Sequence, residues 1–397
     1  MKKILIISQR KSLRGAHKAA VELEKVLKLT PKNRVTFFSE DNAIKNKISF
    51  VKIKIFKIIN RFIKPFFRKK NEITNTLPQI FKFFDHKKYK FDLILINYVY
   101  EFFSIRDIVL FQKPTIIFIH DMWFLGGIKH FFTKISLKKD FKKKFLSIYG
   151  LLNFFAWKFK RYYLNKNKKI IFITSSQWLK NQAQSSIILK NHHIEKINTP
   201  VDTSYWKKSN KIFSRKKLNL PIDKYLILFV AKGGLENYRK GGDIFKNIIL
   251  NFKNQDKINF VILGHQKNHE DKLLKNLFFI NFNDDNYKLR NLYNAVDLSF
   301  CLSRHENIPY SVIESMSCGV PNISINTGGL DEIIKHKNNG WILKNTKISN
   351  IKMAINWSLN KNNYSSLSKN SINFVKKEFS HSKVRKDYDK LFKSISK

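Results

Sequence analysis

Short apolar runs recur along the chain, and stretches whose apolar positions repeat at helical spacing lie between them. Runs of this kind, bounded by polar residues, predict strands that are buried on both faces of a sheet. The stretches between them predict amphipathic helices. Strands are therefore predicted at residues 3–8, 35–39, 91–97, 115–119, 169–176, 194–198, 225–231, 258–264, 277–282, 297–302 and 322–326.

The alternation of strand, loop and helix predicts an α/β fold with doubly wound parallel sheets. A chain of 397 residues is long enough for two or three domains. The polar, Lys- and Ser-rich stretch at residues 207–219 is predicted to link an N-terminal domain, residues 1–206, to a C-terminal domain, residues 220–378. Helices are predicted from residue 177 to about residue 189 and from residue 380 to residue 394.

Residues 303–334, SRHENIPYSVIESMSCGVPNISINTGGLDEII, carry the clearest candidate chemistry. Glu306 lies in the loop after a predicted strand, and Glu314 lies about one turn into the helix that follows. Gly319 and Pro321 are predicted to end that helix. Glycine fits the left-handed position beyond a helix end, and proline cannot continue a helix.

The spacing of these elements predicts that both carboxylates face one crevice at the carboxyl edge of a sheet. The next strand leads to Gly328 and Gly329, where a ligand can approach the backbone closely. Two predicted helix N-termini open onto the same edge, and their N–H groups suit a phosphate. Acidic groups for sugar hydroxyls beside N–H groups for phosphate indicate a nucleotide-sugar site. Either carboxylate alone would be interpreted as a solvated surface group.

A glycine-rich basic loop follows the predicted strand at residues 225–231. Its sequence, KGGLENYRKGG at residues 232–242, has four glycines and three basic residues. Glycines with Lys and Arg between a strand and a helix form a cradle for phosphate. Lys232, Arg239 and Lys240 are therefore candidate phosphate ligands, and a solvated loop without a ligand is the alternative.

In the N-terminal half, the predicted strand at residues 115–119 runs directly into His120 and Asp121. A histidine at the carboxyl end of a parallel strand stands where such folds place chemistry, although a structural, hydrogen-bonding histidine fits the same position. The first loop lacks the Gly-x-Gly-x-x-Gly fingerprint of dinucleotide sites and offers only Gly15. Gly15 is either a glycine of a phosphate or acceptor loop or a simple turn glycine.

These motifs resemble the retaining GT-B glycosyltransferases of the family-4 type, the glycosyl transferases group 1. The family signature is Glu, seven residues, Glu, then small-Cys-Gly-x-Pro and later Gly-Gly-x-x-Glu. The matching residues here are Glu306, Glu314, 317–321 and 328–332. The common Gly-Phe-Gly after the first Glu is replaced by Asn307, Ile308 and Pro309. That replacement, with His-Asp-Met-Trp at residues 120–123, resembles the branch active in exopolysaccharide and lipopolysaccharide assembly.

The resemblance implies two Rossmann-like doubly wound domains that face each other across a cleft. It also implies a C-terminal helix, residues 379–397, that crosses back to the N-terminal domain. The C-terminal domain would bind most of the donor, with the diphosphate on Lys240 and Lys232. Glu314 would accept hydrogen bonds from the ribose hydroxyls, and Glu306 would contact the donor sugar. Further donor contacts are assigned to Arg239, Asn307, Ile308, Pro309, Tyr310, Gly328 and Gly329.

The implied reaction moves a sugar from a nucleotide-sugar to a glycan or lipid-linked saccharide, with retained anomeric configuration. His120 would lie beside the reacting sugar carbon, with Gly15 and Asp121 on the acceptor or phosphate side. Lys and Arg would stabilise the leaving diphosphate, so neither a metal nor another cofactor is expected. Alternatives of other classes are a basic nucleic-acid-binding protein and a GT-B-fold epimerase that acts on the nucleotide-sugar alone.

The net charge is +47, from 76 Lys and Arg against 29 Asp and Glu, and it has three explanations. They are nucleic-acid binding, contact with an anionic membrane, and A+T-rich coding. No nucleic-acid-binding module is recognisable, so nucleic acid is not expected as a partner. Residues 48–70 and 129–169 interleave apolar residues with Lys and Arg. This pattern predicts contact with an anionic membrane surface, and ordinary surface helices are the rival interpretation.

The expected location is the cytoplasm, with peripheral attachment to the inner face of the cytoplasmic membrane. No apolar run reaches ~18 residues without charge, so no transmembrane helix is expected. The first residues lack the pattern of a signal peptide. The 2 cysteines, Cys301 and Cys318, have neither metal-ligand spacing nor a disulfide framework, which fits a reducing compartment.

Overall fold

The computed structural model of the chain describes residues 2–10, 12, 15–63, 77–82, 84, 90–132, 147–252, 254–264, 276–281 and 285–395. The chain divides into two compact units. Unit 1 is Met1–Pro200 with Val384–Lys397, and unit 2 is Val201–Lys383. The boundaries predicted near residues 206 and 378 therefore fall at 200 and 383 in this division.

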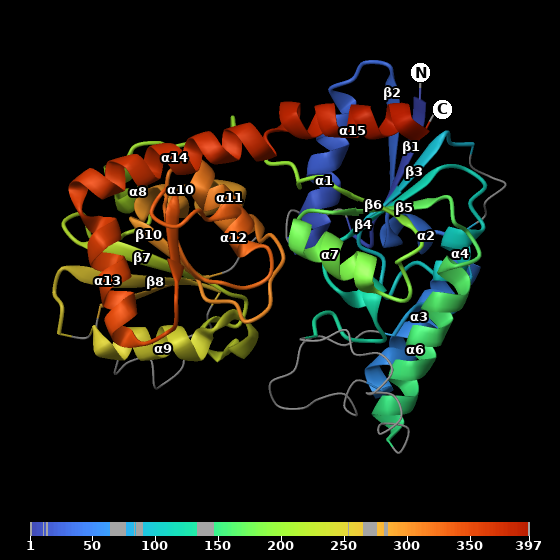
Figure 1. Cartoon of the computed structure of the whole chain (residues 1–397), viewed down its shortest axis with the longest axis horizontal. Helices are drawn as coiled ribbons and strands as arrows, with labels where there is room; N and C mark the ends of the chain where they lie inside the picture. The colour runs from blue at the N-terminus through green and yellow to red at the C-terminus, as the bar shows by residue number, and fades with distance from the viewer. Residues whose placement is uncertain are drawn as a thin grey trace. The chain divides into compact units, whose positions relative to one another are not determined.

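Unit 1 contains a parallel six-stranded sheet with the order β2-β1-β3-β4-β5-β6 (Figure 1). Its described strands are β1 (Lys2–Ile7), β2 (Asn33–Phe38), β3 (Leu93–Ile96), β4 (Thr115–Ile119), β5 (Ile170–Thr174) and β6 (His193–Lys196). The helices described with it are α1 (Gly15–Lys28), α2 (Glu40–Ala43), α3 (Lys47–Ile63), α4 (Ile105–Val109), η2 (Trp123–Leu125), α6 (Ile148–Leu164), α7 (Gln177–Ser185) and α15 (His381–Ile395).

The sheet of unit 1 is buried on both faces, because successive side chains of a strand point to opposite sides. On one face, Ile4 and Ile6 of β1 pack in a cluster with residues of α1 and α15. On the other face, Leu5 and Ile7 pack in a cluster with residues of α4, α6 and α7. This two-sided burial explains why the strands are near-continuous apolar runs.

Unit 2 has a second parallel six-stranded sheet, with the order β12-β11-β10-β7-β8-β9. Its described strands are β7 (Tyr225–Val230), β8 (Ile258–Leu263), β9 (Leu277–Ile280), β10 (Leu298–Cys301), β11 (Asn322–Ile325) and β12 (Gly340–Leu343). Its described helices are α8 (Lys211–Lys217), η3 (Gly234–Glu236), η4 (Tyr238–Lys240), α9 (Gly242–Asn251), α10 (Asn286–Ala295), α11 (Tyr310–Ser317), α12 (Leu330–Ile333), α13 (Ile348–Leu359) and α14 (Lys361–Phe379).

The sheet of unit 2 is covered in the same way. Ile227 and Phe229 of β7 pack in one cluster with residues of α9 and α13. Leu226 and Leu228 pack in another cluster with residues of α10, α11 and α14. Two parallel sheets with helices on both faces confirm the predicted α/β class with two Rossmann-like units.

Strand order reverses once in each unit. The chain passes from β1 outward to β2 and then returns to place β3 on the other side of β1. In unit 2 it passes from β7 to β8 and β9 and then places β10 on the other side of β7. Ligands of open parallel sheets bind at such reversals, outside the carboxyl ends of the two strands. The topology thus selects the loops after β1 and β3 in unit 1 and after β7 and β10 in unit 2.

The predicted strands all occur, with ends shifted by at most two residues. Strand β12 was not predicted, because it is a short run that begins with glycine, a residue that is rare in strands. Helix α7 ends at Ser185 rather than near residue 189. The Ser186 hydroxyl accepts a hydrogen bond from the N–H of Ile188 and donates to the carbonyl of Leu125, and this competes with continuing the helix.

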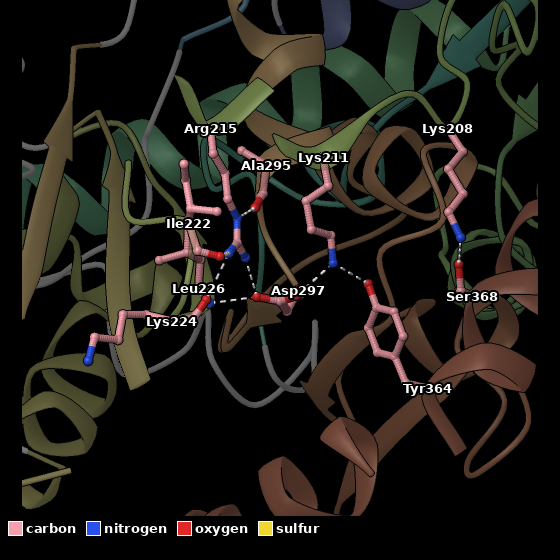
Figure 2. Close-up of polar contacts among 10 residues, drawn as sticks. All are labelled: Lys208, Lys211, Arg215, Ile222, Lys224, Leu226, Ala295, Asp297, Tyr364 and Ser368. Atoms are coloured by element: carbon pink, nitrogen blue, oxygen red, sulfur yellow. Dashed lines mark hydrogen bonds and ion pairs between the residues drawn. The ribbon is translucent and has the colours of Figure 1, made fainter. Parts of the chain in front are cut away.

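The predicted linker at residues 207–219 is wrong in its central part, which forms helix α8 and packs into unit 2 (Figure 2). Arg215 of this helix is buried, and its guanidinium donates to Asp297 at 2.7 Å and to the carbonyl of Ala295 at 2.8 Å. The Asp297 carboxylate also accepts from Lys211 at 2.6 Å and from the N–H of Leu226 at 2.7 Å. A Lys- and Arg-rich stretch favours a solvated linker, but here two of its cations are used to fix the start of β7.

No described helix combines the length and the apolar character that crossing a membrane would require. Of the two basic segments, residues 48–63 lie in α3 and residues 147–164 include α6. Residues 64–70 and 133–146 lie outside the described part of the chain.

We predict that Arg215→Met lowers the free energy of unfolding by about 3 kcal/mol, because it leaves Asp297 buried without its guanidinium partner. The control is Lys216→Met, which removes the same charge from an exposed position on the same helix. Urea unfolding measures both variants. Equal stability of the two variants would show that the buried ion pair does not hold α8 in place.

Candidate active site

The loops after β7 and β10 meet at a shared ionic contact. The Glu306 carboxylate contacts the Lys240 amine, lies 3.6 Å from the Arg239 guanidinium and accepts from the Ser303 hydroxyl at 3.4 Å. Burial alone would raise the pKa of Glu306, but the Lys240 and Arg239 cations lower it below its usual value, as does a hydrogen bond from the Asn307 N–H. Glu306 is therefore an ionised carboxylate in a cationic, largely enclosed setting.

Backbone contacts hold the same two loops together. The Arg239 guanidinium donates to the carbonyl of His305 at 3.0 Å, and the N–H of Arg304 donates to the carbonyl of Arg239 at 2.8 Å. Arg304 also lies over the Tyr238 ring and makes two hydrogen bonds of 2.7 Å to Asp243, in the first turn of α9. These contacts fix the position of Lys240 relative to Glu306.

Two glycines permit the close approach of these loops. Gly241 has φ +80°, and a Cβ there would lie 2.3 Å from the carbonyl oxygen of Leu302. Gly328, in the loop after β11, has φ +62°, and a Cβ there would lie 1.7 Å from the carbonyl oxygen of Glu306. Both positions need glycine for its conformation and for its lack of a side chain. Three loops thus converge on Glu306, from β7, β10 and β11.

The other predicted donor residues surround this point. Lys232 is exposed in the same loop as Lys240, and Gly329 precedes α12 as its N-cap. Asn307 and Ile308 are buried, and Pro309 is the N-cap of α11. Tyr310 is the first residue of α11, directly after this loop.

Glu314 is buried on helix α11, and the prediction that it faces a crevice shared with Glu306 stays a prediction. It lies in the second turn of α11 with a fractional exposure of 2%, and it accepts a hydrogen bond of 3.3 Å from the Tyr293 hydroxyl of α10. Tyr293 is a residue that sequence reasoning missed. A signal was present, because a buried tyrosine hydroxyl needs a polar partner.

In unit 1, His120 lies at the carboxyl end of β4. Its Nε2 contacts the amide oxygen of Asn97, and the Asn97 amide nitrogen donates to the carbonyl of Ala16 at 3.2 Å. The amide oxygen can only accept, so Nε2 carries the proton in this contact. Burial lowers the pKa of His120 to about 4, with a further contribution from His17, although Asp121 acts in the opposite direction. His120 is therefore neutral at physiological pH.

Asp121 organises the loop that follows His120. Its carboxylate accepts from the Tyr100 hydroxyl at 2.9 Å, from the N–H of Trp123 at 2.9 Å and from His130 at 2.7 Å. Burial acts to raise the pKa of Asp121, but His130 and these hydrogen bonds lower it below its usual value. These contacts make Asp121 an anchor of the loop, and its predicted role on the acceptor or phosphate side stays a prediction.

The same loop is held from α6 by Lys160, a residue that sequence reasoning missed. Lys160 has a fractional exposure of 0%, its amine donates to the carbonyls of Trp123 and Gly127, and it lies 3.9 Å from the centre of the Trp123 ring. Burial lowers the pKa of Lys160 well below its usual value. Asn153 of α6 also accepts from the N–H of Ile128 at 3.0 Å.

Gly15 begins α1 with φ +51° and has open space around it, since a Cβ there would meet no atom within 4 Å. It lies after β1, at the strand reversal of unit 1. Within the described ranges, no three His, Cys, Asp or Glu side chains gather closely enough to hold a metal ion. The expectation of a metal-independent reaction stays a prediction.

Comparison with known proteins places the site of unit 2 in a recognised domain. Residues 210–376 match the family described as Glycosyl transferases group 1. A search of curated proteins finds no match. The matched span includes every residue of the Glu306 site described above, and the site of unit 1 lies outside it.

Similar folds occur among solved structures. Sucrose-phosphate synthase from Thermosynechococcus elongatus has a TM-score of 0.70 at 16% identity, over 100% of this chain and 99% of that chain. A glycosyltransferase from Rickettsia africae has a TM-score of 0.65 at 16% identity, over 100% and 99% of the two chains. HepE from Anabaena in complex with UDP has a TM-score of 0.62 at 14% identity, over 99% and 100%. At these identities the likeness establishes the fold.

We predict that Gly328→Ala destabilises the protein more than Gly233→Ala does, by at least about 1 kcal/mol. Both glycines have positive φ, 62° and 89°, but a Cβ at Gly233 would meet only the Cβ of Asn237 at 3.9 Å. The difference therefore isolates the close approach of Gly328 to Glu306. Urea unfolding of both variants measures it, and equal losses of stability would contradict the convergence of the three loops.

Proposed function

We propose that this chain, which has the GT-B fold and a region similar to glycosyl transferases group 1, is a glycosyltransferase that moves a sugar from a nucleotide-sugar to an acceptor hydroxyl with retained anomeric configuration. The observation that carries the proposal is the contact of Glu306 with Lys240 and Arg239 at the strand reversal of unit 2. A carboxylate and two cations on fixed loops match the two halves of a nucleotide-sugar, its sugar hydroxyls and its diphosphate.

In the proposed reaction, the donor diphosphate becomes the partner of Lys240 and Arg239, together with Lys232. The Glu306 carboxylate, released from its cations, accepts hydrogen bonds from the donor sugar. As the bond from the sugar to the diphosphate breaks, negative charge grows on the leaving phosphate. Fixed cations stabilise that charge most where water is largely excluded, and this is the main source of the rate enhancement.

The remaining residues have proposed roles around these two groups. The N–H groups near Ile308 to Tyr310 hold the donor sugar, and the backbone at Gly328 and Gly329 lies against it. Glu314 accepts from the ribose hydroxyls. His120 belongs to the other unit, and its assignment beside the reacting carbon remains a prediction. A neutral imidazole in that position would act as a hydrogen-bonding group rather than as a cation.

The donor is proposed to be a uridine-diphosphate sugar, because HepE was solved with UDP and with UDP-glucose. The acceptor is proposed to be a glycan or lipid-linked saccharide, in the synthesis of cell-surface polysaccharide, by resemblance to the branch described above. Neither substrate needs a metal in this proposal, since the cations of the site are side chains.

We predict that Glu306→Gln and Lys240→Met each lower donor hydrolysis or sugar transfer at least about 100-fold, because each removes charge from the reacting centre. Lys257→Met, an exposed lysine near the amino end of β8, is the control for loss of charge and should keep full activity. Turnover of radiolabelled UDP-glucose measures all three variants. Full activity of both site variants would overturn the assignment, and conversion of donor alone into an epimer would identify an epimerase instead.

We further propose that unit 1 attaches to an anionic membrane through helices α3 and α6. These helices lie side by side, and they share a small apolar cluster that includes Phe56 and Ala156 (Figure 1). Each also exposes a stripe of large apolar side chains at intervals of three, four or seven residues. The stripe residues are Ile48, Val51, Ile55, Ile58 and Phe62 on α3 and Ile148, Leu151, Phe155 and Tyr162 on α6.

The positive charge beside these apolar stripes favours an anionic membrane as the partner. Lys54 and Arg61 are exposed on α3, and Lys158 and Arg161 are exposed on α6. Apolar side chains flanked by exposed cations fit a surface of acyl chains beneath anionic head groups. A second copy of this chain fits less well, because two surfaces of the same positive sign repel each other. Attachment to the cytoplasmic face of a membrane would bring the enzyme to a lipid-linked acceptor.

We predict that Ile55→Ser with Phe62→Ser abolishes flotation with vesicles of phosphatidylglycerol, because it removes apolar surface from the α3 stripe. Phe62 is 74% exposed. The control is Ile212→Ser with Phe213→Ser, which removes side chains that are 53% and 55% exposed on α8 of unit 2. Wild-type protein that fails to float, or a control that fails equally, would contradict the proposed surface.

A further inference from the structure

The hydrogen bond between Tyr293 and Glu314 joins helices α10 and α11 inside unit 2. The Tyr293 hydroxyl donates to Oε2 of Glu314 at 3.3 Å, and both side chains are buried. Burial, together with the neighbouring Glu314 carboxylate, raises the pKa of Tyr293 well above its usual value. Tyr293 therefore keeps its proton and acts as a hydrogen-bond donor.

The core of unit 2 holds Tyr293 in place. Its ring packs in the core cluster of unit 2 and lies 5.8 Å from the ring of Trp206. The neighbouring Asn294 accepts from the N–H of Ser209 at 2.6 Å and donates to the carbonyl of Lys207 at 3.2 Å. Helix α10 thus presents the hydroxyl from a fixed position, and the hydroxyl fixes one oxygen of the Glu314 carboxylate.

Glu314 is joined to the donor site through its own helix. Helix α11 begins at Tyr310, directly after the loop that carries Glu306, and Glu314 follows Tyr310 by one turn. A carboxylate accepts several hydrogen bonds at once, so it can receive one from Tyr293 and others from a ligand. A buried carboxylate that is held in one orientation loses little freedom when a ligand binds, and this raises its affinity for a matching pair of hydroxyls.

We propose that Tyr293 is a positioning residue that orients Glu314 for the two hydroxyls of the donor ribose. The inference rests on the proposed function, which assigns the ribose to Glu314. In addition, the Tyr293 hydroxyl fixes the orientation of the Glu314 carboxylate. The enzyme's preference for ribose over deoxyribose therefore depends on Tyr293.

The test compares binding of UDP, GDP and ADP with binding of their 2′-deoxy counterparts, by calorimetry on the full chain. For the base that it binds most tightly, wild type should have a higher affinity for the ribonucleotide than for the 2′-deoxyribonucleotide. Glu314→Gln should lose most of that difference in affinity. Tyr293→Phe should reduce the preference at least about fivefold, because a hydrogen bond to a charged group is lost. With a nucleotide-sugar, Tyr293→Phe should raise KM and leave kcat at saturating donor within about twofold.

The control is Tyr225→Phe, which removes a hydroxyl at the amino end of β7, at the opposite edge of the sheet from the donor site. Thermal melting of Tyr293→Phe establishes that it is folded, and adding Tyr293→Phe to Glu314→Gln should cause no further loss of preference, because Tyr293 acts only through Glu314. Wild type without any ribose preference, or without nucleotide binding, would overturn the assignment of Glu314 in the proposed function. A preference that Glu314→Gln loses but Tyr293→Phe retains would overturn the role of Tyr293 alone.

Discussion

The contact between Glu306 and Lys240 joins loops that leave adjacent parallel strands but lie 66 positions apart in the sequence. A chain with 76 Lys and Arg and only 29 Asp and Glu has few carboxylates to distribute. Several of them lie beside a cation where loops or helices must be held together. Glu306 does this for the donor loops, Asp243 for the start of α9 and Asp297 for α8. The scarce negative charges therefore determine much of the local geometry of unit 2.

The small number of carboxylates also explains why the two candidate sites differ in charge. At the Glu306 site, two cations stand against one carboxylate, so the loops carry a net positive charge. Around His120, the basic side chains have internal roles. Lys160 supports backbone carbonyls, and His130 is paired with Asp121. The site of unit 1 thus offers a neutral imidazole on a firmly anchored loop, which is suited to orienting an uncharged sugar or hydroxyl.

Sequence reasoning was sufficient where the physical signal is local. Apolar runs predicted the strands, because a strand buried on both faces leaves no room for polar residues. The loop residues around Glu306 could be predicted as candidates, because the order of strand, loop and helix places them at one sheet edge. Contacts that depend on distant partners could not be predicted in this way. Arg215 and Lys160 are cations that composition assigns to the surface, and only their partners, Asp297 and the carbonyls of the Trp123 loop, explain their burial. The orientation of Glu314 toward Tyr293 depends likewise on how α10 packs against α11.

The last helix has a consequence for the order in which the chain can fold. Val384, Tyr388, Leu391 and Phe392 complete the same apolar cluster as Ile4 and Ile6 of the first strand, and the Lys2 amine lies over the Phe392 ring. During synthesis, residues 201–383 emerge before this helix and contain the whole of unit 2. Unit 1 begins to emerge first, but the face of its sheet that α1 also covers stays incomplete until this helix has been synthesised. Unit 2 can therefore reach its native core earlier, and a chain that stops short of residue 384 would retain the loops around Glu306, whereas unit 1 would lack its last helix.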